Sequence, residues 1–222
     1  MVDEEATDHT RTPLTKARVL DAALRIVDRD GLDGLSMRKV ARALGAGAMS
    51  LYHHVADKET LLDELVDLVF AEIALPPAGA DWRAALRQRM RSALDVLERH
   101  PWAIALMESR TRPGPANLRQ REAMLGVLRR AGLTVAAATH AQWVLDSYLY
   151  GYALQLATLP FEGAAGLAEM AEEVFLPQLD ADAHPYLTEA AHALTAAGYD
   201  PASEFDVGLE VVLDAIDALR RR

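Results

Sequence analysis

Apolar residues recur at intervals of three and four along nearly the whole chain, and this spacing limits the possible fold more than any other feature. It is the period of an α-helix with one buried face, whereas a half-buried strand alternates apolar and polar residues. No stretch sustains that alternation, and the strong helix formers Ala and Leu dominate the sequence. We therefore predict an all-α fold.

Capping residues divide the first 79 residues into four predicted helices. Ser36 and Asp57 are suitable N-caps, because their side-chain oxygens can accept the free amide hydrogens of a first turn. Gly31 and Gly45 are suitable residues at helix C-termini, where the backbone often turns left-handed. The four helices are expected at about 15–31, 36–45, 48–54 and 58–74, and the Pro- and Gly-containing segment 75–79 follows them.

Beyond this break the predicted helices are longer, at about 81–99, 101–108, 116–130, 134–158, 185–197 and 201–220. Two prolines and two glycines make 159–182 the least regular segment, and we expect a short helix there together with loop. These helices predict a flexible tail (1–13), a three-helix domain (14–57), a connecting helix (58–74) and a larger helical domain (75–222).

Charge differs between the two predicted domains. The formal net charge of −10 opposes contact with nucleic acid, because phosphate neutralisation requires Lys and Arg. However, residues 10–60 contain nine Lys and Arg against six Asp and Glu, whereas 61–222 contain 14 against 23. This asymmetry favours a protein that contacts DNA through its N-terminal end, with ordinary scatter of surface charge as the alternative.

Several other functions are disfavoured by what the sequence lacks. There is no cysteine, no apolar run of the length that spans a membrane and no secretory signal, so we expect a cytoplasmic protein without a membrane partner. No Gly-x-Ser-x-Gly, His-Glu-x-x-His or phosphate-binding loop is present, which argues against an enzyme. His53 and His54 point about 100° apart on a helix and cannot share one ion, so we expect neither a metal nor a cofactor.

Three short helices with tight, glycine-containing turns are typical of a helix-turn-helix, in which one helix enters the major groove of DNA. In the third helix, Leu51 and Val55 share one face and can pack inward. The opposite side carries Met49, Ser50, Tyr52 and His53. Hydroxyl and imidazole groups can bind phosphates or base edges, so this side is the candidate DNA-binding surface. Tyr52 could instead be partly buried, with only its hydroxyl at the surface.

The residues of this region also follow a known pattern: Gly31-Leu32-Asp33-Gly34-Leu35-Ser36-Met37-Arg38-Lys39-Val40-Ala41, then Gly45, then Ser50-Leu51-Tyr52-His53-His54-Val55, then Lys58 and Leu61-Leu62. From about 14 to 65 the chain resembles the TetR family of transcriptional regulators. The resemblance implies a repressor that binds a palindromic operator as a dimer and is released by a small, largely apolar effector. A TetR-like activator and a regulator without an effector are the alternatives. The residues implied at or beside double-stranded operator DNA are Ser36, Met37, Arg38, Ala48, Met49, Ser50, Tyr52, His53, His54 and Lys58.

Beyond residue 75 the resemblance is weaker and is closest to the tetracycline-repressor subgroup, through Thr111-Arg112-Pro113, 128–134 and 205–216. It implies that the helices at 134–158 and 201–220 form a homodimer interface. The sequence indicates the same independently, because the last helix is apolar over more than one face. A fully buried helix in a monomer is the alternative.

The effector site departs from that subgroup. Its magnesium-binding histidine is replaced by Glu108 and an acidic residue by Gln155, while other polar contacts align with Ala74, Arg89 and Met124. We therefore expect an apolar pocket rather than a magnesium-dependent one, with Glu108 as a buried carboxylate that pairs with a cationic or hydroxylated effector. The candidate lining is Trp82, Leu86, Met90, Trp102, Met107, Glu108, Met124, Trp143, Tyr148, Tyr152 and Gln155, for each of which simple core packing is the alternative.

Overall fold

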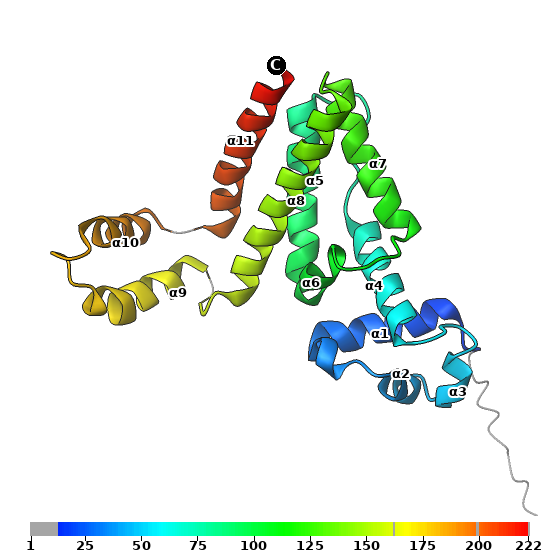
Figure 1. Ribbon diagram of the computed structural model, residues 1–222. Helices are drawn as coiled ribbons and strands as arrows, with labels where there is room; N and C mark the ends of the chain where they lie inside the picture. Colours follow the sequence, from blue (N-terminus) through cyan, green and yellow to red (C-terminus); the bar gives the residue numbers. More distant parts are fainter. Residues whose placement is uncertain (1–12, 162, 199, 222) are drawn as a thin grey trace, which may run out of the picture.

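The computed structural model describes residues 13–161, 163–198 and 200–221, and it is helical with no β-strand in these ranges, as the sequence predicts (Figure 1). The N-terminal domain consists of α1 (Lys16–Asp30), α2 (Met37–Ala43) and α3 (Ala48–Leu51), which lie together at one end of the molecule. The next helix, α4 (Lys58–Glu72), leads out of this domain and packs on both α1 and α7 (Pro115–Arg130).

The expected capping residues begin these helices. Thr15, Ser36 and Asp57 accept backbone N–H groups of Arg18, Lys39 and Thr60 at 3.3, 3.3 and 2.7 Å. Gly31 follows α1 with a φ of +69°, a conformation that side-chain-bearing residues rarely adopt. The third helix is shorter than predicted: it ends at Leu51, and 52–54 form a turn that leads to the buried Val55 and the new N-cap at Asp57.

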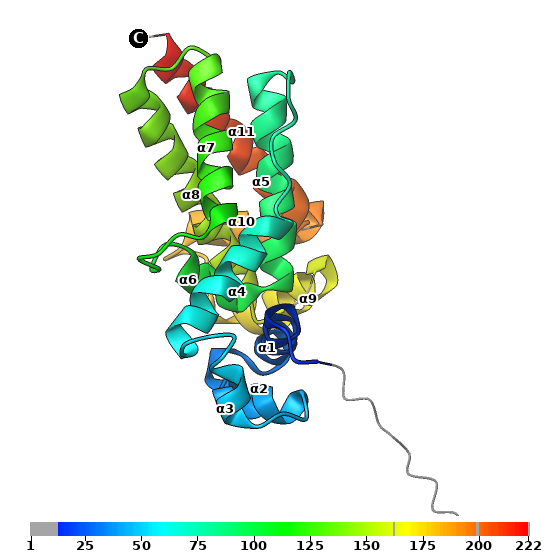
Figure 2. The ribbon, with the colours of Figure 1, turned by 90° about the vertical axis from the view of Figure 1, so that its right-hand side faces the viewer.

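The larger domain is a bundle built from α5 (Trp82–Arg99), α7, α8 (Val135–Thr158) and α11 (Pro201–Arg220), with the short α6 (Ile104–Met107) at its base (Figure 2). Helix α8 packs on α5, α7 and α11. The core between these helices includes Leu86, Met90, Leu145, Leu149 and Leu209, all fully buried. Each such side chain contributes about 1.5–3 kcal/mol on removal from water, so these residues stabilise the packing of the bundle.

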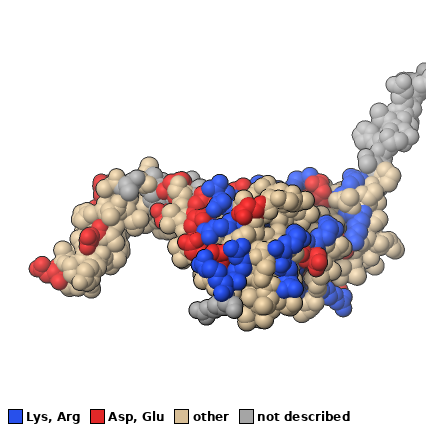
Figure 3. Space-filling model, turned by 90° about the horizontal axis from the view of Figure 1, so that it is seen from above, with Lys and Arg blue, Asp and Glu red and all other residues tan. Residues whose placement is uncertain are grey.

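An arm projects from the side of this bundle between α8 and α11. It contains α9 (Gly163–Met170), five residues of π-helix (Ala171–Phe175), a 3-10 turn (Leu176–Gln178) and α10 (Pro185–Ala197). The segment 159–182 is thus more helical than the sequence predicts. No Lys or Arg occurs from 131 to 219, and the arm accordingly shows acidic but no basic side chains in Figure 3.

Candidate functional site

The turn between α2 and α3 fixes the orientation of the candidate DNA-binding surface. Leu51 is fully buried and Val55 is 2% exposed, in the same core as Val40 of α2, as their spacing predicts. Because Leu51 holds one face of α3 inward, the other face is directed to solvent. Met49 is 76% and Tyr52 46% exposed, so Tyr52 is not a core residue.

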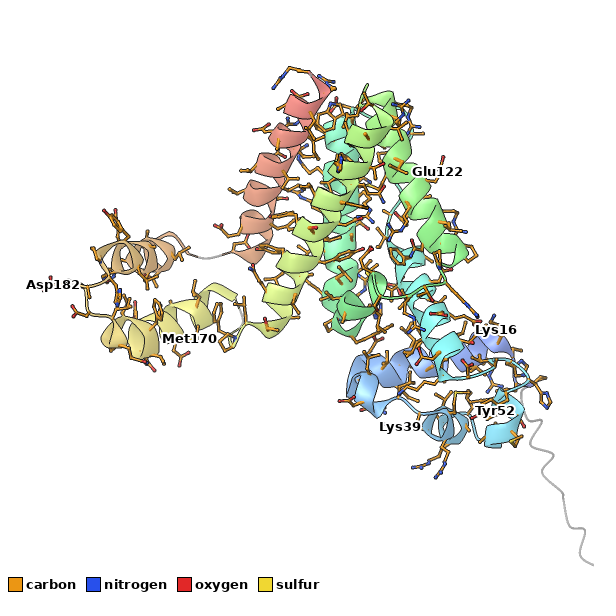
Figure 4. The ribbon with its side chains drawn as sticks, in the orientation of Figure 1. Lys16, Lys39, Tyr52, Glu122, Met170 and Asp182 are labelled. Carbon is orange, nitrogen blue, oxygen red and sulfur yellow. The ribbon has the colours of Figure 1, made fainter. Side chains whose placement is uncertain are left out.

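The other residues predicted to bind DNA lie on α3 or on the segments next to it. Arg38, Ser50, His53 and Lys58 are exposed, whereas Ala48, Met37 and His54 are half-buried. Tyr52 lies at the free end of the domain together with Lys39 of α2 (Figure 4). Ser36 is exposed and accepts the amide hydrogen of Lys39 at 3.3 Å, so its first role is to cap α2.

Cations on this surface differ in their availability to an external anion. Lys39 Nζ forms an ion pair with Asp30 Oδ2 at 2.7 Å, and together with Arg29 it holds the pKa of that carboxyl far below its usual value. Arg38 and Lys58 form no ion pair with the carboxylates that the structure describes. These two cations can therefore bind phosphate without first breaking an internal contact.

The connecting helix α4 is attached to the larger domain at two places along its length. Asp67 caps α7, because its carboxylate accepts the backbone N–H groups of Ala116 and Asn117 at 3.2 and 2.9 Å. Arg110, in the segment before α7, donates to Glu59 at 2.9 Å and to Asp63. These contacts tie the segment between α6 and α7 to α4.

A second group of contacts joins the N-terminal domain to the base of the bundle. His100 lies with Nδ1 2.7 Å from Asp28 of α1 and Nε2 3.2 Å from Glu72 of α4. The indole N–H of Trp102 donates to the same Asp28 oxygen at 2.7 Å. Trp102, which the sequence suggested for an effector pocket, is therefore part of the domain interface.

Helices α5, α7 and α8, together with Phe70 of α4, line a small cavity of about 10 Å³, which is roughly the room that one water molecule needs. Most of the residues that line it are polar or charged, whereas the effector pocket expected from the sequence is apolar. Of the predicted lining, only Glu108 and Met124 belong to it. The full lining is Phe70, Arg89, Glu108, Gln120, Arg121, Met124, Gln142, Asp146 and Tyr150.

Some of the charged side chains that line this cavity have hydrogen-bond partners, and others lack a charged partner. Glu108 accepts from Arg121 at 2.8 Å and from the Tyr150 hydroxyl at 3.3 Å. Arg89 is only 3% exposed, and burial lowers its pKa, while burial raises the pKa of Asp146 to about 6. Burial likewise raises the pKa of Tyr150, so its phenol stays protonated and can donate a hydrogen bond.

Apart from Glu108 and Met124, the effector candidates lie outside this cavity. Glu108 is not buried: half of its side chain is exposed, because it lies at the end of α6 and faces Arg121 on the surface side of α7. Trp143 is 63% exposed on the outer side of α8, and Gln155 is exposed near the end of that helix. Trp82 packs beside Arg220 at the far end of the bundle. Leu86, Met90 and Met107 are core residues, and Tyr148 and Tyr152 pack on Phe205 of α11.

Sequence reasoning missed most of the polar lining, although a signal was present. Gln142, Asp146 and Tyr150 follow each other at intervals of four in a helix that is otherwise largely apolar. Such a stripe lies on one face of the helix. Polar groups on a helix face that points inward indicate a polar site, but the sequence alone does not show which face points inward.

Two helices present a second apolar face that the residues described by the structure do not cover. On α11, Phe205 and Leu209 point into the bundle, whereas Val207 and Val211 are 62% and 67% exposed. Trp143 and Val144 on α8 are exposed as well. Exposed apolar side chains of this size on neighbouring helices are typical of a subunit interface.

Two sequence-family models match the chain. One, described as bacterial regulatory proteins of the tetR family, matches residues 19–65, and the other, described as the tetracyclin repressor-like C-terminal domain, matches 75–220. The chain belongs to the TetR family. The resemblance that the residues of the N-terminal domain indicated is thereby confirmed.

Known members of the family match over most of this chain. HTH-type transcriptional repressor DrrR1 of Streptomyces coeruleorubidus is 35% identical over 93% of this chain and 78% of its own length. Tetracycline repressor protein class A of Escherichia coli, from transposon 1721, is 32% identical over 92% and 91% of the two chains. The structure of ActR of Streptomyces coelicolor in complex with actinorhodin superposes with a TM-score of 0.79, at 29% identity over 95% and 100% of the two chains.

Two features are absent from the described residues. None of their helices is both long and apolar enough to cross a membrane. No group of three or more His, Asp or Glu side chains within the same ranges is arranged to hold a metal ion.

Proposed function

We propose that this chain is a ligand-released transcriptional repressor that binds a palindromic operator as a homodimer. The observation that carries the proposal is the outward face of α3, where Met49, Ser50 and Tyr52 are exposed beside Arg38 and Lys58, two cations that form no ion pair within the described residues. The similarity to named repressors of this family supports it. This function places the protein in the cytoplasm, where its operator DNA is.

The residues of this surface divide into two roles. Arg38 and Lys58 neutralise phosphates and set the position of the domain on the duplex. Ser50 and Tyr52 supply hydroxyls to phosphates or base edges, and Met49 supplies an apolar contact of the kind that fits a thymine methyl. Sequence selectivity is therefore expected to come from α3, and most of the salt-dependent affinity from the two cations.

Dimerisation gives the protein its preference for symmetrical DNA. The exposed Val207, Val211 and Trp143 supply the apolar area for a partner's α8 and α11, in line with the interface proposed at 134–158 and 201–220. A two-fold dimer must hold its recognition helices about 34–36 Å apart to enter successive major grooves. A change in this distance weakens operator binding without any change in the DNA-binding residues.

Effector binding that opens the cavity between α5, α7 and α8 can produce that change. The Glu108–Arg121 pair lines the cavity, and Arg110, two residues after Glu108, donates to Glu59 and Asp63 of α4. An effector that separates this pair moves the 108–114 segment and thereby tilts α4 with the domain that it carries. Thermodynamic linkage makes the two effects equal. The effector lowers the affinity for the operator, and the operator lowers the affinity for the effector, by the same factor, typically about 5- to 150-fold.

Fluorescence anisotropy with overlapping duplexes from the DNA upstream of the gene tests whether this surface binds DNA. Arg38→Met should weaken binding and lower the slope of log affinity against log salt by about one unit, as expected for one lost phosphate contact. Arg119→Met is the matched control, because Arg119 is exposed on α7 in the other domain. An unchanged slope for Arg38→Met would exclude that residue from the interface.

The alternatives are a TetR-like activator and a regulator that needs no effector. Transcription in vitro from the bound promoter separates them: a repressor lowers transcript yield when it occupies the operator, whereas an activator raises it. A screen of small aromatic compounds against the protein–operator complex then tests effector release. If no compound releases the protein from its operator, the result would favour a regulator that needs no effector.

A further inference from the structure

The two domains meet at a buried histidine that faces two carboxylates. His100, 6% exposed, follows the end of α5 at the base of the bundle. Its Nδ1 lies 2.7 Å from Asp28 Oδ1 of α1, and its Nε2 lies 3.2 Å from Glu72 Oε1 of α4. Asp28 belongs to the N-terminal domain, and Glu72 is the last residue of the helix that carries this domain. One imidazole ring thus joins three helices at the domain junction.

Both ring nitrogens need a proton if both contacts are to be hydrogen bonds. A neutral imidazole has one N–H group and one acceptor nitrogen, whereas the imidazolium donates from both nitrogens. An ionised carboxylate only accepts, so a neutral His100 would turn a lone pair toward an oxygen of either Asp28 or Glu72. The imidazolium donates to both carboxylates in charge-assisted bonds, which are about twice as strong as neutral ones.

The other charged groups at this junction leave Asp28 dependent on the ring. Arg99, at the end of α5, pairs with the second oxygen of Glu72 at 2.7 Å. The indole of Trp102 donates to the Asp28 oxygen that His100 contacts, but it carries no charge. Helix α8 also contacts the turn that follows His100, yet within the described residues none of its side chains forms an ion pair with the ring. His100 is therefore the cation that ties α1 to the bundle.

We propose that His100 is a proton-sensitive tie between the N-terminal domain and the bundle. With two ring protons it holds α1 and the end of α4 in place. When pH rises and one proton leaves, one of the two hydrogen bonds becomes a contact between lone pairs, and the junction loosens. Histidine is the side chain whose charge normally changes between about pH 5 and pH 8, so the proton is the ligand of this site. The inference goes beyond the proposed function and does not depend on it.

Hydrogen–deuterium exchange of α1 tests the tie without DNA. Operator affinity is a poor readout, because His53 and His54 on the DNA-binding surface are histidines as well. When pH is raised from about 6 to about 8.5, the backbone amides of α1 in the wild type should lose about 10-fold in protection relative to those of α8, as expected for one lost charged hydrogen bond. Labelling times are scaled for the pH dependence of intrinsic exchange.

Three variants separate the charge of the ring from its packing. His100→Gln does not titrate, so α1 should be about 10-fold less protected than in the wild type at pH 6 and should not change with pH. In Glu72→Gln the new amide can donate to Nε2, so a neutral ring satisfies both sides and α1 should stay protected up to about pH 8.5. His192→Gln, which removes an exposed histidine of α10, should behave as the wild type. Asp146 is common to all these proteins, so its titration cancels in the comparison.

Three results would overturn the proposal: protection of α1 that is independent of pH in the wild type, a fall that persists in His100→Gln, or a fall in Glu72→Gln equal to that in the wild type. If His100→Gln does not fold, the comparison of Glu72→Gln with the wild type decides alone. A wild type that shows the predicted fall but binds no operator would refute the repressor proposal and leave this inference standing.

Discussion

Asp146 should make the stability of the protein depend on pH in an unusual direction. Burial raises its pKa to about 6 from an ordinary value of 3.8. The folded chain therefore holds this proton between those two pH values after the unfolded chain has lost it, so the carboxyl destabilises the fold progressively as pH rises from about 4 to 6. At about 1.4 kcal/mol per pKa unit, the full penalty above pH 6 is about 3 kcal/mol per chain.

Urea unfolding of the wild type and Asp146→Asn, followed from about pH 4 to pH 8, measures this penalty. Asparagine does not titrate, and the remaining groups are common to both proteins. The free energy of unfolding of the variant, relative to the wild type, should rise by up to about 3 kcal/mol between about pH 4 and pH 7.5 and then stay level. A difference that is independent of pH, or that falls over this range, would show that Asp146 is not held in a desolvated cavity and would refute the electrostatic account of that cavity.

Three further substitutions test the packing and the coupling. Gly208→Ala places a methyl group 2.3 Å from the Tyr148 hydroxyl, so it should lower the free energy of unfolding by about 1–3 kcal/mol; unchanged stability would contradict the α8–α11 packing. His100→Phe removes the contact with Asp28 and should cost about 1–3 kcal/mol by urea unfolding, while an unaffected protein would show that this contact does not hold the domains together. Arg110→Met should leave operator affinity within about threefold but weaken effector-induced release, measured by anisotropy; full release would exclude this side chain from the coupling.

The N-terminal domain could be predicted in detail because its determinants are local. Ser36 and Asp57 cap the helices that follow them, and both Leu51 and Val55 are buried, as their apolar character predicts. The end of α3 was misjudged, because helical periodicity continues through 52–54 while the chain turns there to reach Val55. Helix ends depend on such tertiary contacts more than helix positions do.

The cavity could not be predicted in the same way. Its charged groups come from separate helices, and only the packing of α5 on α7 and α8 brings Arg89 near Gln120 and Asp146. Aromatic content was a poor guide, because the same ring can serve packing, a domain interface or a subunit surface. Trp102 binds Asp28, and Trp143 faces solvent.

The most direct test of the central claim is analytical ultracentrifugation of the protein with its upstream duplex, repeated with one half of the bound palindrome scrambled. A dimeric repressor with one recognition helix per half-site forms complexes of two protomers, or of whole dimers, and loses at least about 10-fold in affinity when a half-site is scrambled. Single protomers bound to DNA, or equal affinity for the intact and scrambled sites, would contradict the account.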